Sequence, residues 1–429
     1  VGSSEAGLRL MLSVLAGYPV ALVHRKYVYG RNSNIQHLYF LISGLVLGYL
    51  NYGSDILHPL TAVLVTYATL TLFGGSIISV AITFTFNMTY LLLGYYYVGT
   101  NNYDINWTMP QCIAVLRLIG LAFDLYDGKQ PIESLSKDSK KVALRETPKF
   151  LETLGFAFFP TSFLVGPQFP LRRYQDFVEG KFSQNPNSVE AAIKRFLLGI
   201  MFLVFFLTLS QFVTDDYIMS EHFCNSNMLK KCFLLGLWGR SALYKYISCW
   251  LLTEGACILF GITYNGEDEH RVKQWNGVEN VKVSLLENAT EFNHYIQAFN
   301  INTNSWVAQY IYKRLKFLGN RYISQAASLF FLAAWHGFHS GYYLCFSFEF
   351  VVMFLEKDLK PLIKGNPTVS KIIEQSPFNT LVYILLRLYT FVFMGWCLLP
   401  FVLLTYDRYW PVFGAVNYIG FLLFCLYPV

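Results

Sequence analysis

The sequence ISQAASLFFLAAWHGFHSGYYLCFSFEFVVMF, residues 323–354, decides how the rest of the chain is interpreted. It contains no Lys, Arg or Asp, and its only acidic residue and histidines are Glu349, His336 and His339. A run of this length and apolarity can cross a bilayer as a helix. A histidine inside such a helix is costly to bury in lipid, so it is a functional candidate by default. We therefore expect one long apolar helix with His336 near its middle.

The composition of the chain is that of a membrane protein. Of its 429 residues, 54% are hydrophobic and only 14% are charged, whereas charged residues make up about a quarter of a typical soluble domain. The net charge of +6 fits Lys and Arg in cytoplasmic loops better than a nucleic-acid surface. The eight cysteines form no CxxC pair, so neither a disulfide framework nor a zinc site is predicted. We expect a polytopic protein in the lipid bilayer with no nucleic-acid partner.

Apolar runs long enough to cross a bilayer recur along the whole chain. Clear runs occupy residues 8–23, 35–49, 56–73, 77–98, 196–213, 381–404 and 409–427. Residues 110–125 span only marginally, and residues 229–264 suit either one tilted helix or two shorter ones. We predict an all-α polytopic fold, a bundle of roughly ten to twelve transmembrane or re-entrant helices around an internal chamber. A single domain is expected over residues 1–429.

Two parts of this bundle carry features that an ordinary spanning helix lacks. The segment FLVGPQFPLRRY, residues 163–174, is apolar but rich in glycine and proline, and irregular backbone at membrane depth occurs only where it is buried in protein or lines a cavity. We expect it to help wall the chamber, with a plain interfacial loop as the alternative. In the marginal span, Arg117 and Asp124 lie two helical turns apart on one face, so they are expected to share a polar network or to serve helix packing.

Basic residues indicate which connecting segments face the cytoplasm. Residues 128–149 hold six Lys and Arg against three acids. Residues 265–321 form the longest polar stretch, and we assign them mainly to the cytoplasmic face. This segment contains the pattern of an amphipathic helix, with apolar residues at Phe292, Tyr295, Ile296 and Phe299. The motif FNINTNSW, residues 299–306, follows at the end of that helix.

The histidines offer a general base. A neutral imidazole in an apolar site has a free nitrogen that can accept the proton of an alcohol. The small residues around His336 leave room for a substrate, and we expect Trp335, His339 and Ser340 to line the chamber. His339 lies one turn away, so spacing does not choose between the two histidines. The alternative is a histidine that is satisfied by a carbonyl of another helix.

The asparagine motif offers a hydrogen-bond donor. The amide of Asn300 is suited to donate to a developing oxyanion or to orient a carbonyl. The alternative for this cluster, which includes Asn302, Thr303 and Asn304, is helix capping. The chain has no GxSxG, Walker or HExxH motif and no acidic metal cluster, so neither a serine nucleophile nor a metal mechanism is supported, and no metal ligand is assigned.

These motifs, in this order and membrane setting, resemble the membrane-bound O-acyltransferase family and its lysophospholipid branch over nearly the whole chain. The resemblance rests on Asn300 in FNINTNSW and His336 in AAWHGFHSGYY. It is extended by FLVGPQFPLRRYQDF, by RLIGLAFDLYDG at residues 117–128, and by WGRSALYKYISCWLLTEGACILFGITYNG at residues 238–266. It implies the helical bundle of that family around a reaction chamber, with His336 and Asn300 as the catalytic pair.

The resemblance also implies the reaction. An acyl chain, preferably polyunsaturated, would pass from acyl-CoA to the sn-2 hydroxyl of a lysophospholipid, with lysophosphatidylcholine preferred and lysophosphatidylethanolamine and lysophosphatidylserine also used. Acyl-CoA would be a co-substrate, and no bound cofactor is expected. With direct attack on the thioester, no covalent enzyme intermediate is needed. Because CoA is anionic and cytosolic, we expect its phosphates near the basic residues Lys313, Arg314, Lys316 and Arg321; the alternative is that these are ordinary positive charges of the cytoplasmic face.

The same resemblance implies a multi-pass protein of the endoplasmic reticulum membrane. The printed sequence starts with Val1 and ends at Tyr427-Pro428-Val429 without the basic tail expected there, so this location rests on the resemblance alone. The oligomeric state is left open. Two rival functions remain at this point: a polytopic transporter, against which no internal repeat is found, and a related enzyme that acylates a protein or a sterol.

Overall fold

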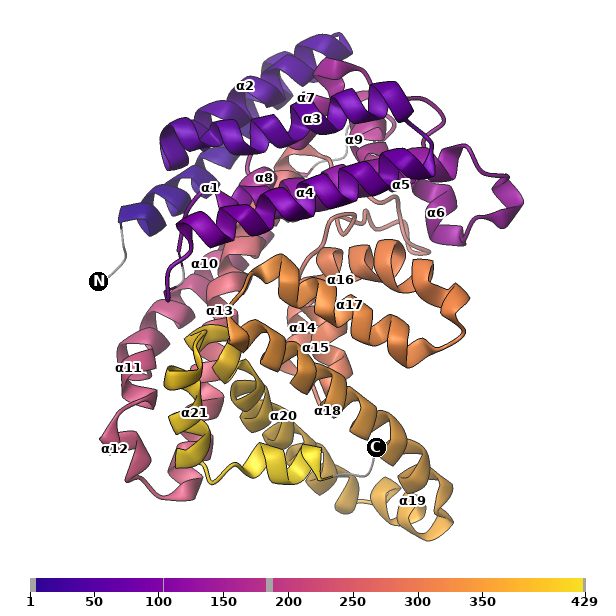
Figure 1. Cartoon of the computed structure of the whole chain (residues 1–429). Coiled ribbons are helices and arrows are strands. Elements are labelled where there is room, and N and C mark those ends of the chain that lie inside the picture. The colour runs from indigo at the N-terminus through magenta and orange to yellow at the C-terminus, as the bar shows by residue number, and fades with distance from the viewer. Residues whose placement is uncertain (1–4, 103, 183–187, 427–429) are drawn as a thin grey trace.

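A computed structural model describes residues 5–102, 104–182 and 188–426 of the chain. Over these residues the secondary structure is helical, apart from two isolated bridges that pair Glu267 with Lys273 and Val281 with Phe299. The first helices cross one another in a layer above the central helices, and the last helices form the opposite end of the molecule (Figure 1). The C-terminal residues 427–429 lie outside the described part.

The α-helices follow the chain in this order. They are α1 (Glu5–Val23), α2 (Ser33–Tyr52), α3 (Leu57–Phe73), α4 (Ile77–Val98), α5 (Thr108–Gly128), α6 (Lys137–Val142), α7 (Phe150–Ala157), α8 (Ser162–Val165), α9 (Leu171–Val178), α10 (Val189–Phe212), α11 (Asp215–Ile218), α12 (Glu221–Cys224), α13 (Met228–Phe260), α14 (Val283–Glu287), α15 (Phe292–Ala298), α16 (Ile301–Val307), α17 (Arg321–His336), α18 (Ser340–Gly365), α19 (Pro367–Glu374), α20 (Phe378–Leu403) and α21 (Tyr406–Ala415).

Six stretches of the described chain are long and apolar enough to cross a membrane by length and composition. They are Glu5–Val28, Ser33–Phe73, Ile77–Val98, Thr108–Gly128, Val189–Phe212 and Phe378–Leu403. The prediction of a polytopic, all-helical membrane protein is confirmed. Helix α13 is one continuous helix of 33 residues. Residues 229–264 therefore contain one long helix and not two shorter ones.

The predicted span at residues 409–427 is wrong. Helix α21 ends at Ala415, and a short π-helix follows at Phe421–Cys425. Between them Asn417 and Tyr418 have φ angles of +52° and +53°, which no regular helix contains. The two pieces instead pack against Trp396, which is fully buried and contacts the rings of Phe413 on α21 and Phe421 on the π-helix.

The long apolar run at residues 323–354 is also not one helix. It consists of α17 and α18, which lie side by side in Figure 1 and are joined by Gly337, Phe338 and His339. Gly337 has φ +130°, a conformation that L side chains rarely adopt, and it ends the helix. His336 is therefore the last residue of α17 and not the middle of a span.

Arg117 and Asp124 are both buried on α5 but do not share a network. The guanidinium of Arg117 donates to the carbonyls of Phe156 and Ala157, each at 2.9 Å, while Asp124 accepts from the hydroxyl of Tyr310 at 2.7 Å. Arg117 therefore supports the broken backbone at the end of α7, where carbonyls would otherwise lack partners. Of the two predictions for this pair, helix packing is therefore the correct one, and each residue serves it at a different place.

Candidate functional site

A cavity of about 960 Å³ lies between α13, the α15–α16 segment, the α17–α18 junction and α20. Most of its lining is apolar or aromatic. The irregular backbone after α8 contributes Gly166, Pro167 and Gln168 to the wall, which confirms the prediction for that glycine- and proline-rich segment. The cavity is thus formed by segments that lie far apart in the sequence and converge only in the fold.

His336 faces this cavity from the end of α17. Its ring is surrounded by the rings of Trp335, Tyr342, Phe346 and Phe401, with centroids 4.8–5.6 Å away. No hydrogen bond from another described residue reaches either ring nitrogen, so the alternative of a histidine held by a carbonyl is not realised in the described chain. An imidazole of this kind can accept a proton from a bound hydroxyl.

The three predicted lining residues divide between two places. Trp335 and His339 line the cavity; the indole of Trp335 also donates to the carbonyl of Cys112 at 3.1 Å. Ser340, the first residue of α18, does not line it; its hydroxyl lies 3.0 Å from the hydroxyl of Tyr409 on α21. The prediction for Ser340 is therefore wrong, since the break at Gly337 turns this residue away from the face that carries His336.

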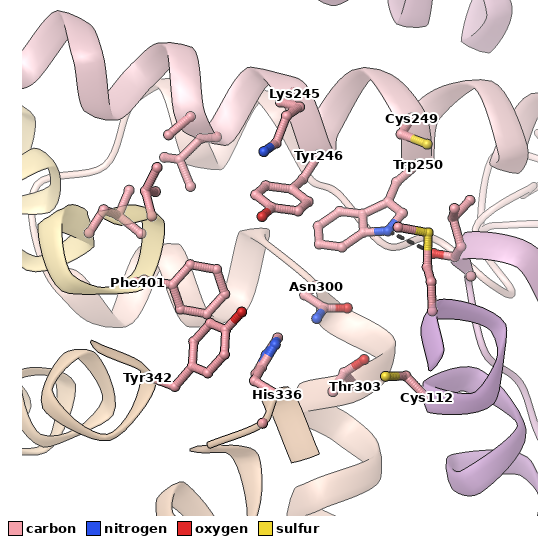
Figure 2. Close-up of a pocket in the computed structure, with 18 of the residues that line it drawn as sticks. Cys112, Lys245, Tyr246, Cys249, Trp250, Asn300, Thr303, His336, Tyr342 and Phe401 are labelled. Atoms are coloured by element: carbon pink, nitrogen blue, oxygen red, sulfur yellow. Dashed lines mark hydrogen bonds between the residues drawn. The ribbon is translucent and has the colours of Figure 1, made fainter. Parts of the chain in front are cut away.

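Asn300 lies at the N-cap position of α16 in the left-handed conformation, with φ +50° and ψ +45°. Asparagine tolerates this conformation better than most side chains. Its side chain makes no capping hydrogen bond, and Asn302, Thr303 and Asn304 lie inside α16 and not at its cap. The motif therefore does not cap the start of α16, although the side-chain NH2 of Asn304 donates to the carbonyls of Ile296 and Phe299 at the end of α15. The amide of Asn300 is directed into the cavity (Figure 2).

A neighbouring asparagine determines which way that amide points. The Oδ1 of Asn280 accepts a hydrogen bond from the backbone N–H of Asn302 at 3.0 Å. A backbone N–H only donates, so the other end of the Asn280 amide is its NH2 group. That group lies 3.3 Å from Asn300 and donates to its Oδ1. The NH2 of Asn300 is then the end left for the cavity.

An ion pair holds Asn280 in turn. The carboxylate of Glu254 on α13 accepts the backbone N–H of Asn280 at 2.8 Å, and Glu254 pairs with Arg195 of α10, whose Nε donates to it at 2.6 Å. Glu254 and Asn280 are almost completely buried. Charge-assisted hydrogen bonds are stronger than neutral ones, so the segment between α13 and α14 that holds Asn280 is anchored to two long helices.

The four basic residues expected near CoA lie outside the cavity lining. Arg314 pairs with Asp127 through both terminal nitrogens, at 2.8 Å and 2.6 Å. Lys313 pairs with Asp138, and its ammonium lowers the pKa of that carboxyl through a hydrogen bond. The Lys313 pair joins the 265–321 segment to the 128–149 segment, and the Arg314 pair joins it to the C-terminal end of α5; both contacts agree with the prediction of a common membrane face.

The other two basic residues are on the surface. The guanidinium of Arg321 donates to the hydroxyl of Tyr322 at 2.9 Å and lies 4.9 Å from the centre of its ring. Lys316 is exposed on the short 3-10 helix Lys313–Leu318. The structure therefore gives Lys313 and Arg314 partners within the protein and leaves the role of all four in CoA binding a prediction.

The sequence did not single out the α13 face of the cavity. Figure 2 shows Lys245, Tyr246, Cys249 and Trp250 lining it opposite His336. Within the described lining Lys245 is the one lysine or arginine, and its ammonium lies 4.9 Å from the centre of the Tyr246 ring. The signal in the sequence is that the run at residues 229–264 carries the ionisable groups Arg240, Lys245 and Glu254, and such groups within a membrane segment are functional candidates.

Together these groups can perform a defined type of chemistry. The cavity holds a proton acceptor at His336 and a hydrogen-bond donor at Asn300, in surroundings where electrostatic interactions are strong because most of the lining is apolar. A base and an oxyanion donor are what transfer of an acyl group to a hydroxyl requires. The same cavity is large enough for parts of two substrates.

Comparison with known proteins agrees with this chemistry. The model of the membrane-bound O-acyltransferase family matches residues 92–403. Three proteins named lysophospholipid acyltransferase 5 are similar over almost the whole chain: one from Drosophila melanogaster is 48% identical over 98% of this chain and 86% of its own length. Those from Mus musculus and Homo sapiens are each 42% identical over 99% of this chain and 88% of their own length. The chain therefore belongs to the membrane-bound O-acyltransferase family.

Proposed function

We propose that this protein transfers an acyl chain from acyl-CoA to the sn-2 hydroxyl of a lysophospholipid and so remodels membrane phospholipids. The relatives named above are called lysophospholipid acyltransferases. We further propose lysophosphatidylcholine as the first acceptor, lysophosphatidylethanolamine and lysophosphatidylserine as further acceptors, polyunsaturated acyl-CoA as the donor, and the endoplasmic reticulum membrane as the location.

The proposed reaction proceeds in one addition and one elimination. His336 takes the proton of the lysolipid hydroxyl as its oxygen attacks the thioester carbonyl. The NH2 group of Asn300 donates a hydrogen bond to the oxyanion that develops. Stabilisation of the developing charge is usually the largest single contribution to the rate of acyl transfer. The C–S bond then breaks, the thiolate of CoA takes the proton from His336, and the ester is left in the cavity.

The charge of the cavity suggests how the acceptor is oriented. A lysophospholipid carries a phosphodiester close to its reacting hydroxyl, and CoA carries its phosphates far from the thioester. Lys245 is the one lysine or arginine in the described lining, so we place the acceptor phosphate at its ammonium. Holding both substrates in one apolar cavity lowers the barrier because their ordering is completed on binding.

The observation that carries the proposal is that the imidazole of His336 and the NH2 end of Asn300, neither of which is hydrogen-bonded by a described residue, face one cavity. The test is acyl transfer by purified protein in detergent, with labelled arachidonoyl-CoA and lysophosphatidylcholine. Wild type should form phosphatidylcholine, and His336→Ala and Asn300→Ala should each lower kcat at least about a hundredfold while remaining folded. Wild type that forms no ester with any acceptor would refute the proposal.

An acceptor panel distinguishes the rival enzymes of the same family. Acylation of a protein or a sterol uses the same base and donor, so only the acceptor differs. With acyl-CoA held constant, the rate with lysophosphatidylcholine should exceed that with a sterol or a peptide hydroxyl. A transporter would instead move a solute across a vesicle membrane and form no ester.

A further inference from the structure

The amide of Asn300 has two ends of opposite chemistry, and only one of them suits an oxyanion. Its NH2 group donates a hydrogen bond, whereas its carbonyl oxygen would repel a developing negative charge. A half-turn of the side chain about its last torsion exchanges the two ends with little change in shape. The activity proposed above therefore depends on whatever keeps the NH2 end toward the cavity.

Three features of the structure converge on one residue for this task. Asn280 is the described side chain that donates to the Oδ1 of Asn300, at 3.3 Å. The opposite end of the Asn280 amide is fixed by the backbone N–H of Asn302 at 3.0 Å and by the side-chain NH2 of the same residue at 3.1 Å. The Asn280 side chain is almost completely buried, so water does not replace these partners.

The backbone beneath Asn280 is equally restrained. Its N–H donates to Glu254 at 2.8 Å, and its carbonyl accepts the N–H of Ile301 at 3.1 Å. The adjacent bridge between Val281 and Phe299 joins the same two chain segments. The Asn280 amide therefore cannot turn without breaking its hydrogen bond from the backbone N–H of Asn302.

We propose that Asn280 is a positioning residue that sets the orientation of the Asn300 amide, so that its NH2 end faces the thioester carbonyl during acyl transfer. This inference rests on the proposed function and goes beyond it. Asn280 borders the cavity, but in this scheme it does not contact the reacting atoms. It acts through Asn300, and the backbone N–H of Asn302 supplies the direction for both amides.

The sharpest variant is Asn280→Asp. A carboxylate still accepts from the N–H of Asn302, but it has no donor for Asn300 and attracts the NH2 end of that amide instead. The Asn300 amide should then turn its oxygen into the cavity. We expect kcat to fall about a hundredfold, as when an oxyanion donor is removed, while the KM values for acyl-CoA and lysophosphatidylcholine change less than about twofold.

The second variant, Asn280→Ala, frees Asn300 without reversing it. Loss of one neutral hydrogen bond should lower kcat about fivefold. Matched controls are Asn87→Asp and Asn87→Ala on α4, because Asn87 is a fully buried amide that donates to Thr66 and to the carbonyl of Thr83, each at 2.9 Å, and does not line the cavity. These controls measure the general effect of disturbing a buried amide on thermal unfolding and on kcat.

A double-mutant cycle separates positioning from packing. If Asn280 acts only through Asn300, Asn280→Ala should change kcat less than about twofold when Asn300 is already Ala. Additive losses, or losses in both Asn280 variants no larger than in their Asn87 counterparts, would overturn the inference. If Asn280→Asp does not fold, the cycle with Asn280→Ala decides alone. If wild type forms no ester, both the proposed function and this inference are refuted. If wild type is active and only the predictions for the Asn280 variants fail, the inference alone is refuted.

Discussion

The replacement Lys245→Met tests where the acceptor phosphate binds. Methionine keeps much of the length and apolar surface of lysine and removes its charge. Lys245 is partly buried and is the one lysine or arginine in the described lining, so no second described cation of the lining compensates for its loss. A hydrogen bond to a charged group contributes roughly 1.5–3 kcal/mol. The KM for lysophosphatidylcholine should therefore rise roughly tenfold to a hundredfold.

The assay compares the KM values of wild type and Lys245→Met for three substrates. The KM is measured for lysophosphatidylcholine, for a monoacylglycerol that has the same acyl chain and no phosphate, and for arachidonoyl-CoA. In Lys245→Met only the first value should rise, and the preference for the phospholipid over the monoacylglycerol should shrink by the same factor. Lys245→Arg keeps the positive charge and should stay within about fivefold of wild type.

Two results would refute this reasoning. An unchanged KM for lysophosphatidylcholine in Lys245→Met would show that the phosphate lies elsewhere. A KM that rises for arachidonoyl-CoA and not for the lysolipid would assign the ammonium to a CoA phosphate. The thermal unfolding of Lys245→Met should remain close to that of wild type, which excludes a loss of folded protein as the cause.

Three further predictions follow from the described contacts. His336→Ala should lower kcat at least about a hundredfold, whereas His339→Ala should retain most activity; near-full turnover of His336→Ala would transfer the role of base to His339. Arg314→Ala should destabilise the fold by about 1–3 kcal/mol, because Asp127, 1% exposed, loses its partner; a raised KM for acyl-CoA with unchanged unfolding would contradict this. Gly341→Ala should lower the unfolding temperature, because its Cβ would lie 1.9 Å from the Pro400 carbonyl oxygen and overpacking costs about 1–3 kcal/mol; unaltered unfolding would show that α18 and α20 can separate without cost.

Features that depend on local composition were predictable from the sequence. The span at residues 77–98 coincides with α4 because its limits are set by a glycine turn before it and a polar loop after it. The break in residues 163–174 was predictable because one glycine and two prolines lie within five residues there, and together they disfavour a continuous helix. Its role as part of the cavity wall followed from the need to satisfy irregular backbone away from lipid.

The prediction of one helix over residues 323–354 failed because the hydropathy of the sequence does not change where the helix ends. The run from residue 323 to residue 354 is apolar throughout, and the end of α17 at His336 depends on the positive φ of Gly337. Gly341, four residues later in α18, allows this helix to approach the carbonyl of Pro400 on α20. Contacts with another helix stabilise such a break. A local stretch of sequence does not contain these contacts, so it cannot predict the break.

By itself the sequence determined that this chain is a helical membrane protein, and it identified His336 and Asn300 through the motifs around them. Burial of apolar runs in lipid and the cost of an ionisable group among them are properties of each segment alone. Only the tertiary structure decided that both side chains face one cavity with Lys245, and that Asn280 directs the Asn300 amide. The orientation of a hydrogen bond depends on which donor the fold places opposite each acceptor, and here that donor lies twenty residues away along the chain.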